Sequence, residues 1–230
     1  MLRLIGFFVL VLVCMRILSA VPVLGRLMDV PFLGFWVTAI LVSAAIAKLA
    51  SRSVDRRKLA RQKQALGAVV TPHNQGKLGS LLLAAHDPKR AIAPLENAVR
   101  GEPTSVEWPY RLGCALLETK RPADAVVHLE RAASMDEEHA YGAVQLRLAE
   151  ALYESGRTRD ALAALDRFDR NHGPNPESAF RRGRALRKDG RAKEARASFR
   201  AVKDLARHAT HLQRSSARGW VWRAFFAQWV

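Results

Sequence analysis

The chain of 230 residues has only two cysteines, Cys14 and Cys114, which stand far apart with no second cysteine near either. This spacing excludes a disulfide framework and a zinc ribbon, and it fits a reducing compartment. Apolar residues make up 49% of the sequence, which is enough for a sizeable core and excludes a disordered or collagen-like chain.

The sequence also lacks the short motifs that carry catalysis: it has no G-x-G-x-x-G, Walker loop, G-x-S-x-G or H-E-x-x-H. The best arrangement for a metal is Asp204, His208 and His211, at i, i+4 and i+7 on one helix face, but no fourth ligand accompanies them. We interpret the three as surface side chains. The sequence therefore predicts no metal site, no cofactor and no catalytic residue, and the chain is not expected to be an enzyme.

Acidic residues are scarce at the two ends of the chain. The formal net charge of +16 divides into +8 for residues 1–70, −2 for residues 71–175 and +10 for residues 176–230. A near-neutral middle with basic flanks is typical of a folded domain whose ends face something anionic, such as lipid, nucleic acid or an acidic protein.

Two apolar runs occupy the amino-terminal part of the chain. Leu4–Ala20 is apolar apart from a few residues that include Arg16, and Val30–Ala47 has no charge over 18 residues, just enough to cross hydrocarbon as a helix. Pro22, Gly25 and Pro31 favour a turn between them. We predict a transmembrane helical hairpin over residues 1–49. A cleaved signal peptide with one span, or a segment lying on the membrane surface, are the alternatives.

A dense run of positive charge follows the second apolar segment. Positive charges this close to the end of a span hold that end on the cytoplasmic side. We therefore expect the residues after 48 to be cytoplasmic. We predict a basic juxtamembrane helix over residues 50–70 that contacts anionic head groups, with a solvated linker as the alternative. The expected lipid-contacting side chains here are Arg52, Arg56, Arg57, Lys58, Arg61 and Lys63.

Four segments of the chain resemble one another: AHDPKRAIAPLENAV, TKRPADAVVHLERAA, SGRTRDALAALDRFD and DGRAKEARASFRAVK. Each contains an alanine, and these alanines are spaced by 34, 36 and 34 residues. Each alanine follows a small residue by twelve positions and precedes a large apolar residue by four. The columns are Gly79, Gly113, Ala149 and Gly183; Leu82, Leu116, Leu152 and Leu186; Ala91, Ala125, Ala161 and Ala195; and Leu95, Leu129, Leu165 and Phe199.

These columns resemble the tetratricopeptide repeat over residues 71–207. The resemblance implies an all-α solenoid of about four helix pairs, in which small side chains let the two helices of a pair approach closely and large ones fill the groove of the next repeat. Arg182 departs from the pattern, as do two extra residues within Ser134–Ala143. With a hairpin and a basic stalk, the layout is similar to small bacterial inner-membrane repeat proteins and to HemY-type proteins. That similarity implies a scaffold at the bacterial inner (cytoplasmic) membrane.

In the family register, the first helix of each repeat lines the concave face. This face is expected to be acidic and aromatic in the middle and basic at its far end, which suits an extended peptide or a partner helix, although ordinary solvated charges would look the same. Arg181, Arg184 and Lys188 share one helix face and are expected either to hold a phosphate or carboxylate together or to be solvated. The predicted groove residues are Glu107, Tyr110, Leu117, Glu118, Glu150, Tyr153, Glu154, Phe180, Arg184, Arg187 and Lys188, with Cys114, Leu146 and Glu177 in the same columns.

Residues 208–230 are basic and aromatic. We predict a capping helix that covers the last repeat with Leu212, Trp220, Ala224 and Phe225. A cap does not require Trp222, Phe226 and Trp229, which suit a membrane interface or a partner. The tryptophans that we expect to contact lipid are Trp220, Trp222 and Trp229.

The sequence as a whole therefore predicts a membrane-anchored scaffold or adaptor that binds another protein and helps to assemble a membrane complex. The alternative is a peripheral regulator that binds anionic lipid or nucleic acid through its basic ends. Nucleic acid is the less favoured ligand because no RRM, KH, helix-turn-helix or zinc-finger pattern accompanies the basic residues.

Overall fold

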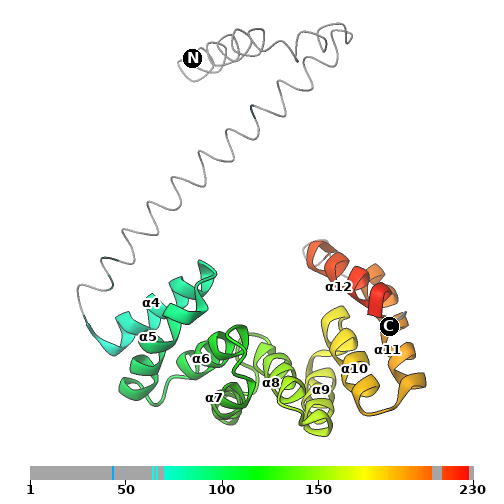
Figure 1. Ribbon diagram of the computed structural model, residues 1–230, viewed down its shortest axis with the longest axis horizontal. Coiled ribbons are helices and arrows are strands. Elements are labelled where there is room, and N and C mark those ends of the chain that lie inside the picture. The colour runs from blue at the N-terminus through cyan, green and yellow to red at the C-terminus, as the bar shows by residue number, and fades with distance from the viewer. Residues whose placement is uncertain (1–42, 44–63, 65, 67–69, 209–213, 228–230) are drawn as a thin grey trace, which may run out of the picture. The chain divides into compact units, whose positions relative to one another are not determined.

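The computed structural model describes residues 43, 64, 66, 70–208 and 214–227 (Figure 1). The chain divides into two compact units, Met1–Gln62 and Lys63–Val230, and the repeats lie in the second. The predicted hairpin over residues 1–49 lies outside the described residues apart from residue 43, and so does most of the predicted basic helix over residues 50–70, including all six of its expected lipid contacts. Among the described residues, no helix combines the length and the apolar character needed to cross a bilayer.

The described part of the second unit is built from helices alone, in four antiparallel pairs and a final single helix. This arrangement confirms the predicted all-α repeat solenoid. The pairs are α4 (Pro72–Ala84) with α5 (Pro88–Gly101), α6 (Glu107–Glu118) with α7 (Pro122–Met135), α8 (Ala143–Glu154) with α9 (Thr158–His172), and α10 (Pro176–Lys188) with α11 (Ala192–His208), and α12 (Arg214–Ala227) follows them.

The helices begin and end at residues whose side chains or backbone conformation favour a helix end. Proline occupies the first turn of α4, α5, α7 and α10, where its missing N–H removes no hydrogen bond. The Asn175 side chain accepts a hydrogen bond from the backbone N–H of Ser178, whose hydroxyl accepts one from the backbone N–H of Asn175, so the two form a capping box at α10. Each pair turns through a residue with positive φ at equivalent places: His86, Lys120, Gly156 and Gly190.

The small residues of the repeat let the two helices of one pair touch. A Cβ at Gly79 would collide with Leu95, one at Gly113 with Leu129, and one at Gly183 would stand 2.5 Å from Phe199. In these three pairs the large column residue therefore fills the glycine position of its own pair. Successive pairs are locked by other residues, such as Trp108 of α6, whose ring lies 2.7 Å from where a Cβ at Gly76 of α4 would be.

The buried side chains form two clusters along the array. The larger runs from α4 to α9 and includes Leu95, Leu116 and Phe168. The smaller joins α9 to α10, α11 and α12 and is centred on Phe199, which is 2% exposed. The last pair and α12 thus share a core of their own, which touches the larger cluster through the half-buried Tyr153.

The two extra residues of the third repeat are accommodated in the loop between α7 and α8. Ala140, Tyr141 and Gly142 all have positive φ, and a Cβ at Gly142 would collide with the His172 ring. The loop is held to both neighbouring pairs. His139 Nε2 lies 3.0 Å from Glu107 Oε2 of α6, and Glu138 Oε2 lies 3.1 Å from His172 Nε2 of α9.

Candidate protein-interaction surface

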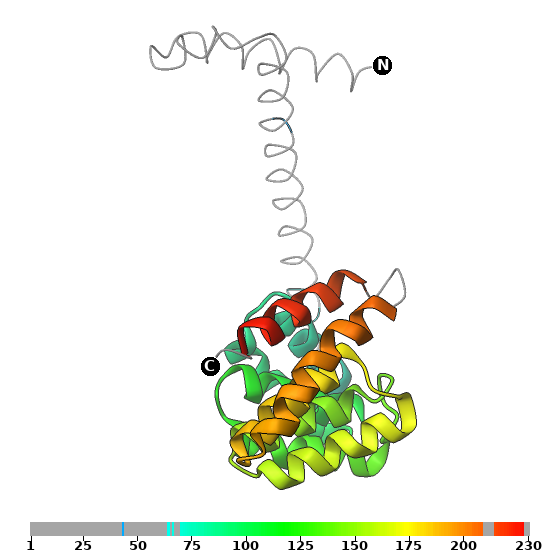
Figure 2. The same ribbon diagram turned by 90° about the vertical axis from the view of Figure 1, so that its right-hand side faces the viewer.

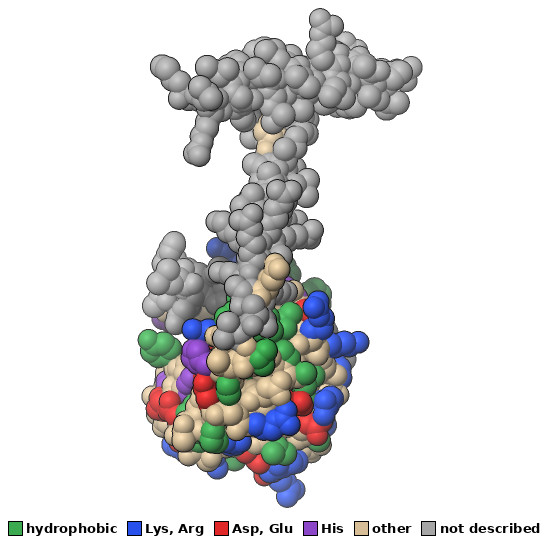
Figure 3. All heavy atoms as spheres, turned by 90° about the vertical axis from the view of Figure 1, so that its left-hand side faces the viewer, with side chains coloured by type: hydrophobic (Ala, Val, Ile, Leu, Met, Phe, Trp, Pro, Cys, Tyr) green, Lys and Arg blue, Asp and Glu red, His purple; other side chains and the backbone are tan. Residues whose placement is uncertain are grey.

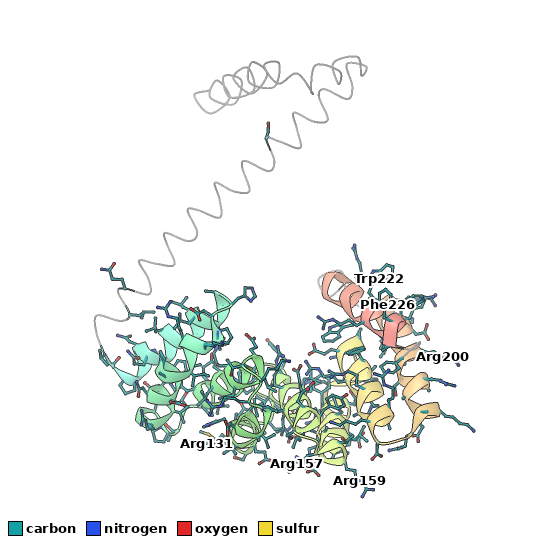
Figure 4. All side chains as sticks on the ribbon, viewed as in Figure 1. Arg131, Arg157, Arg159, Arg200, Trp222 and Phe226 are labelled. Atoms are coloured by element: carbon teal, nitrogen blue, oxygen red, sulfur yellow. The ribbon has the colours of Figure 1, made fainter. Side chains whose placement is uncertain are left out.

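The first helices of the pairs share one face of the array. α4 contacts α6, α6 contacts α8 and α8 contacts α10, whereas each second helix contacts the first helix of the next pair (Figure 1). Side chains such as Arg131, Arg157 and Arg159 lie on the opposite side, that of the second helices (Figure 4). We call the surface formed by the exposed side chains of α4, α6, α8 and α10 the inner face.

The inner face carries a column of basic residues, of which only the last was identified from the sequence. The residue two positions before each small column residue is a lysine or an arginine, and these basic residues repeat with the same spacings of 34, 36 and 34. That spacing was the signal that could have revealed them. The column is Lys77, Arg111, Arg147 and Arg181.

Two arginines of this column, Arg147 and Arg181, are paired with glutamates, one of them across repeats. Arg147 Nη1 lies 2.9 Å from Glu150 Oε2, and Arg181 Nη2 lies 3.1 Å from the same oxygen. Arg181 also contacts Glu177 Oε1 at 2.7 Å and donates to the backbone oxygen of Leu146 at 2.5 Å. We call Arg147, Glu150, Arg181 and Glu177 the ion-pair ladder, which ties α8 to α10.

The ladder is partly removed from water, and this shifts the pKa of Glu150 and of Arg181. Burial alone raises the pKa of the Glu150 carboxyl, but Arg181 and Arg147 outweigh it and hold that pKa below its usual value. Burial lowers the pKa of the Arg181 guanidinium, and Glu150 and Glu177 oppose that shift. Both groups therefore carry their charges at neutral pH because each faces the other.

Two tyrosines line the inner face beside the ladder. Burial raises the pKa of Tyr110 to about 12, so its hydroxyl stays protonated and can donate a hydrogen bond. The Tyr153 ring lies under two cations, with Arg184 Cζ 4.3 Å and Lys188 Nζ 4.6 Å from its centroid. Burial also raises the pKa of the nearby Cys114 thiol, which makes it a poor nucleophile.

The structure differs from the sequence expectation at two groove positions and at one residue of the predicted anion site. Leu146 is buried rather than exposed, and Phe180 is covered because the Trp220 ring of α12 packs on it at a tilt, with 5.4 Å between ring centroids. Arg181 is buried in the ladder and is not available to hold an anion with Arg184 and Lys188. Sequence columns do not reveal pairing between helices 30 or more residues apart.

The remaining predicted groove residues do lie on α6, α8 and α10, but most of their charges are already paired. Arg184 Nη2 lies 2.9 Å from Glu154 Oε1, Lys188 Nζ donates to the backbone oxygen of Tyr153, and Arg187 Nη1 donates to the backbone oxygen of Ala227. Glu107 contacts Arg111, while Glu118 is exposed and Leu117 is half-buried. The predicted change from acidic to basic along the groove is therefore largely neutralised, and charges of both signs are also interspersed on the face shown in Figure 3.

The carboxyl-terminal helix caps the array through part of the expected face. α12 packs against α10 and α11 through Ala217 and Ala224, which are buried, and through Trp220 (Figure 2). Ala224 and Trp220 were predicted for this role. Phe225 was predicted too but is 50% exposed. Leu212 and Trp229 lie outside the described residues.

The metal candidate gains no support from the part of it that the structure describes. His208 Nδ1 lies 2.9 Å from the backbone oxygen of Asp204, and the Asp204 carboxylate pairs with Arg207 at 3.3 Å. His211 falls in the gap between residues 208 and 214. Within the described ranges no three His, Cys, Asp or Glu side chains gather closely enough to hold a metal ion.

Comparison with known proteins identifies the repeat. Tetratricopeptide repeat models match residues 77–140 and 116–179. No curated protein is significantly similar to the chain.

Among solved structures, "Crystal structure of MamA protein" is 20% identical with a TM-score of 0.58, covering 66% of this chain and 85% of that one. "MamA RS-1 ArsTM double mutant" is 18% identical with a TM-score of 0.59, covering 72% and 94%. "MamA 41-end from Desulfovibrio magneticus RS-1" is 16% identical with a TM-score of 0.53, covering 67% and 93%. These similarities show the fold, and together with the two repeat matches they establish that the chain is a tetratricopeptide repeat protein.

Proposed function

We propose that the chain is a membrane-anchored scaffold whose inner face binds an extended segment or a helix of another protein. Stacked helix pairs present long, continuous surfaces, and repeat arrays of this kind are interaction modules rather than catalytic folds. The observation that carries the proposal is the ion-pair ladder. Because Arg147, Glu150, Arg181 and Glu177 satisfy one another, the inner face is held in shape before a partner arrives.

The inner face favours a partner whose binding depends on shape complementarity and hydrogen bonds more than on net charge. Tyr110 and Tyr153 are half-buried aromatic rings on α6 and α8, and the half-buried Leu117 adds apolar surface on α6. The exposed carboxylate of Glu118 stands beside this apolar surface and suits a basic or hydrogen-bond-donating group of the partner. Tyrosines in such settings commonly contribute much of an interface's binding energy.

Site-specific photocrosslinking in native membranes tests this proposal. A photoreactive amino acid at Leu117 or Glu154, both on the inner face, is expected to capture a partner of defined mass, and Tyr153→Ala is expected to abolish the capture. The matched control is the same probe at Arg159, which is 91% exposed on the side of the second helices. Equal capture from Arg159, or capture unaffected by Tyr153→Ala, would contradict binding at the inner face.

We further propose that residues 1–49 fasten the repeats to a bacterial inner membrane, with the repeats in the cytoplasm and the basic residues 52–63 against anionic head groups. The charge-free run Val30–Ala47 and the positive charges after it support this arrangement. After an alkaline carbonate wash, the full chain is expected in the membrane pellet and a chain beginning at Thr71 in the supernatant. Release of the full chain by the wash would contradict the anchor, because carbonate removes proteins held by charge alone.

A further inference from the structure

The small-residue column of the repeats continues into α12. Gly219 follows Gly183 by 36 residues, the same interval that separates Gly113 from Ala149. Trp222 stands three residues after Gly219, as a leucine does after the small residue of each complete pair. In sequence register, α12 is the first helix of a fifth pair.

The structure gives α12 no second helix among the described residues. A Cβ at Gly219 would meet nothing within 4 Å, whereas one at Gly113 or Gly183 would press on Leu129 or Phe199. Trp222 is 64% exposed, although the leucine at its register position is at most 5% exposed in all four complete pairs.

A rotation of α12 about its own axis explains this exposure. Ala217 and Ala224, its most buried residues, stand at the register positions that face the inner side in the complete pairs. The face that packs on a second helix elsewhere is consequently turned outward. It carries Gly219, Trp222 and Phe226 at i, i+3 and i+7, with Phe225 beside them (Figure 4).

The surroundings of this outward face are basic. Arg207 of α11 and Arg218 of α12 line a hollow of about 370 Å³ with Val221 and Trp222. Arg223 lies on the other side of the row formed by Gly219, Trp222 and Phe226. Its Cζ is 4.6 Å from the Trp220 centroid. The basic amino-terminal segment of this chain, with a net charge of +8, is therefore a poor occupant, and an acidic one is favoured.

We propose that the outward face of α12 binds an amphipathic helix of another protein, one that places a large apolar side chain over Gly219 and acidic residues against Arg207, Arg218 and Arg223. The partner helix occupies the position that the second helix takes in each complete pair. The glycine distinguishes this occupant from an anionic bilayer, because helices that pack closely need a position without a Cβ and a lipid surface does not. This surface is separate from the inner face and can bind independently of it.

The probe is a fluorescent helical peptide with the α7 sequence, residues 122–135, in which Leu129 packs on Gly113, with glutamates at its solvent-facing positions. Binding to the full chain in phosphatidylcholine nanodiscs is followed by fluorescence anisotropy. Gly219→Leu fills the packing position, where an added Cβ meets nothing within 4 Å, and Trp222→Ala removes the largest side chain of this face. Each is expected to weaken binding about 10-fold or more. Val127→Ala, at an exposed site on α7, is expected to leave binding unchanged.

Two further arms complete the test. A peptide with lysines in place of the glutamates is expected not to bind the natural chain but to bind the double variant Arg218→Glu, Arg223→Glu. An environment-sensitive dye at position 225, introduced as Phe225→Cys, reports insertion into nanodiscs that contain phosphatidylglycerol. The proposal is overturned if the peptide does not bind, or if its affinity is insensitive to Gly219→Leu. A dye signal that appears with anionic lipid in the absence of peptide assigns the face to the membrane instead.

Discussion

Phe199→Ala is expected to destabilise the carboxyl-terminal end of the array by about 3–5 kcal/mol, the loss typical of a large aromatic residue removed from a packed core. Phe199 is 2% exposed, its ring fills the position that the absent side chain of Gly183 leaves open, and it lies 5.8 Å from the Phe180 ring. Alanine would leave a cavity between α10 and α11 that neither helix can close, because the glycine has no side chain to move into it.

The loss is expected to be local, because Phe199 belongs to the smaller of the two buried clusters. In repeat arrays each unit is stabilised mainly by its neighbours, so α10, α11 and α12 should unfold at lower denaturant than α4 to α9. Hydrogen exchange measured by mass spectrometry on the full chain should show protection lost first in residues 176–227. Phe226→Ala, at a side chain that is 62% exposed, is the matched control and should change little. Uniform loss of protection along the array would contradict the division into two clusters.

The sequence was a good guide to packing within each helix pair. Side chains at glycine positions are absent in any conformation, so a column of Gly79, Gly113 and Gly183 at repeat spacing predicts close helix approach before any coordinates exist. The structure confirms the pairs and adds that Leu95, Leu129 and Phe199 fill those positions within their own pair. Packing of this kind depends on residue size, which the sequence states directly.

The sequence was a poor guide to contacts that depend on how helices are rotated. The burial of Leu146 and Phe180 follows from the exact orientation of α8 and from the position of α12 over α10. The outward rotation of α12 leaves Phe225 exposed, although its place in the sequence suits a cap. The pairing of Arg181 with Glu150, 31 positions away, has no local sequence signal other than the repeated basic column.

Arg181→Met is expected to cost about 3 kcal/mol at neutral pH, close to the lower end of the range for breaking a buried ion pair. Arg181 is 7% exposed and serves three acceptors: Glu150, Glu177 and the backbone oxygen of Leu146. Methionine keeps much of the volume but leaves two carboxylates with fewer partners and removes the side-chain donor of the Leu146 carbonyl, which keeps its hydrogen bond within α8. Arg191→Met is the control, since its partner Glu194 is exposed and such surface pairs contribute little.

The pH dependence separates the loss of charge from the loss of packing. Because the folded protein holds the pKa of Glu150 below its unfolded value of about 4.3, the ladder's contribution is complete above that pH and is lost as pH falls through the folded pKa. In Arg181→Met the carboxyl loses its strongest favourable neighbour, so this contribution is already missing. Denaturation at a series of pH values should therefore show the two proteins far apart at pH 7 and converging below about pH 4. A deficit that stays constant with pH would instead place the role of Arg181 in its contacts with Trp220 and Leu146, and the inner face would then be shaped by packing rather than by the ion-pair ladder.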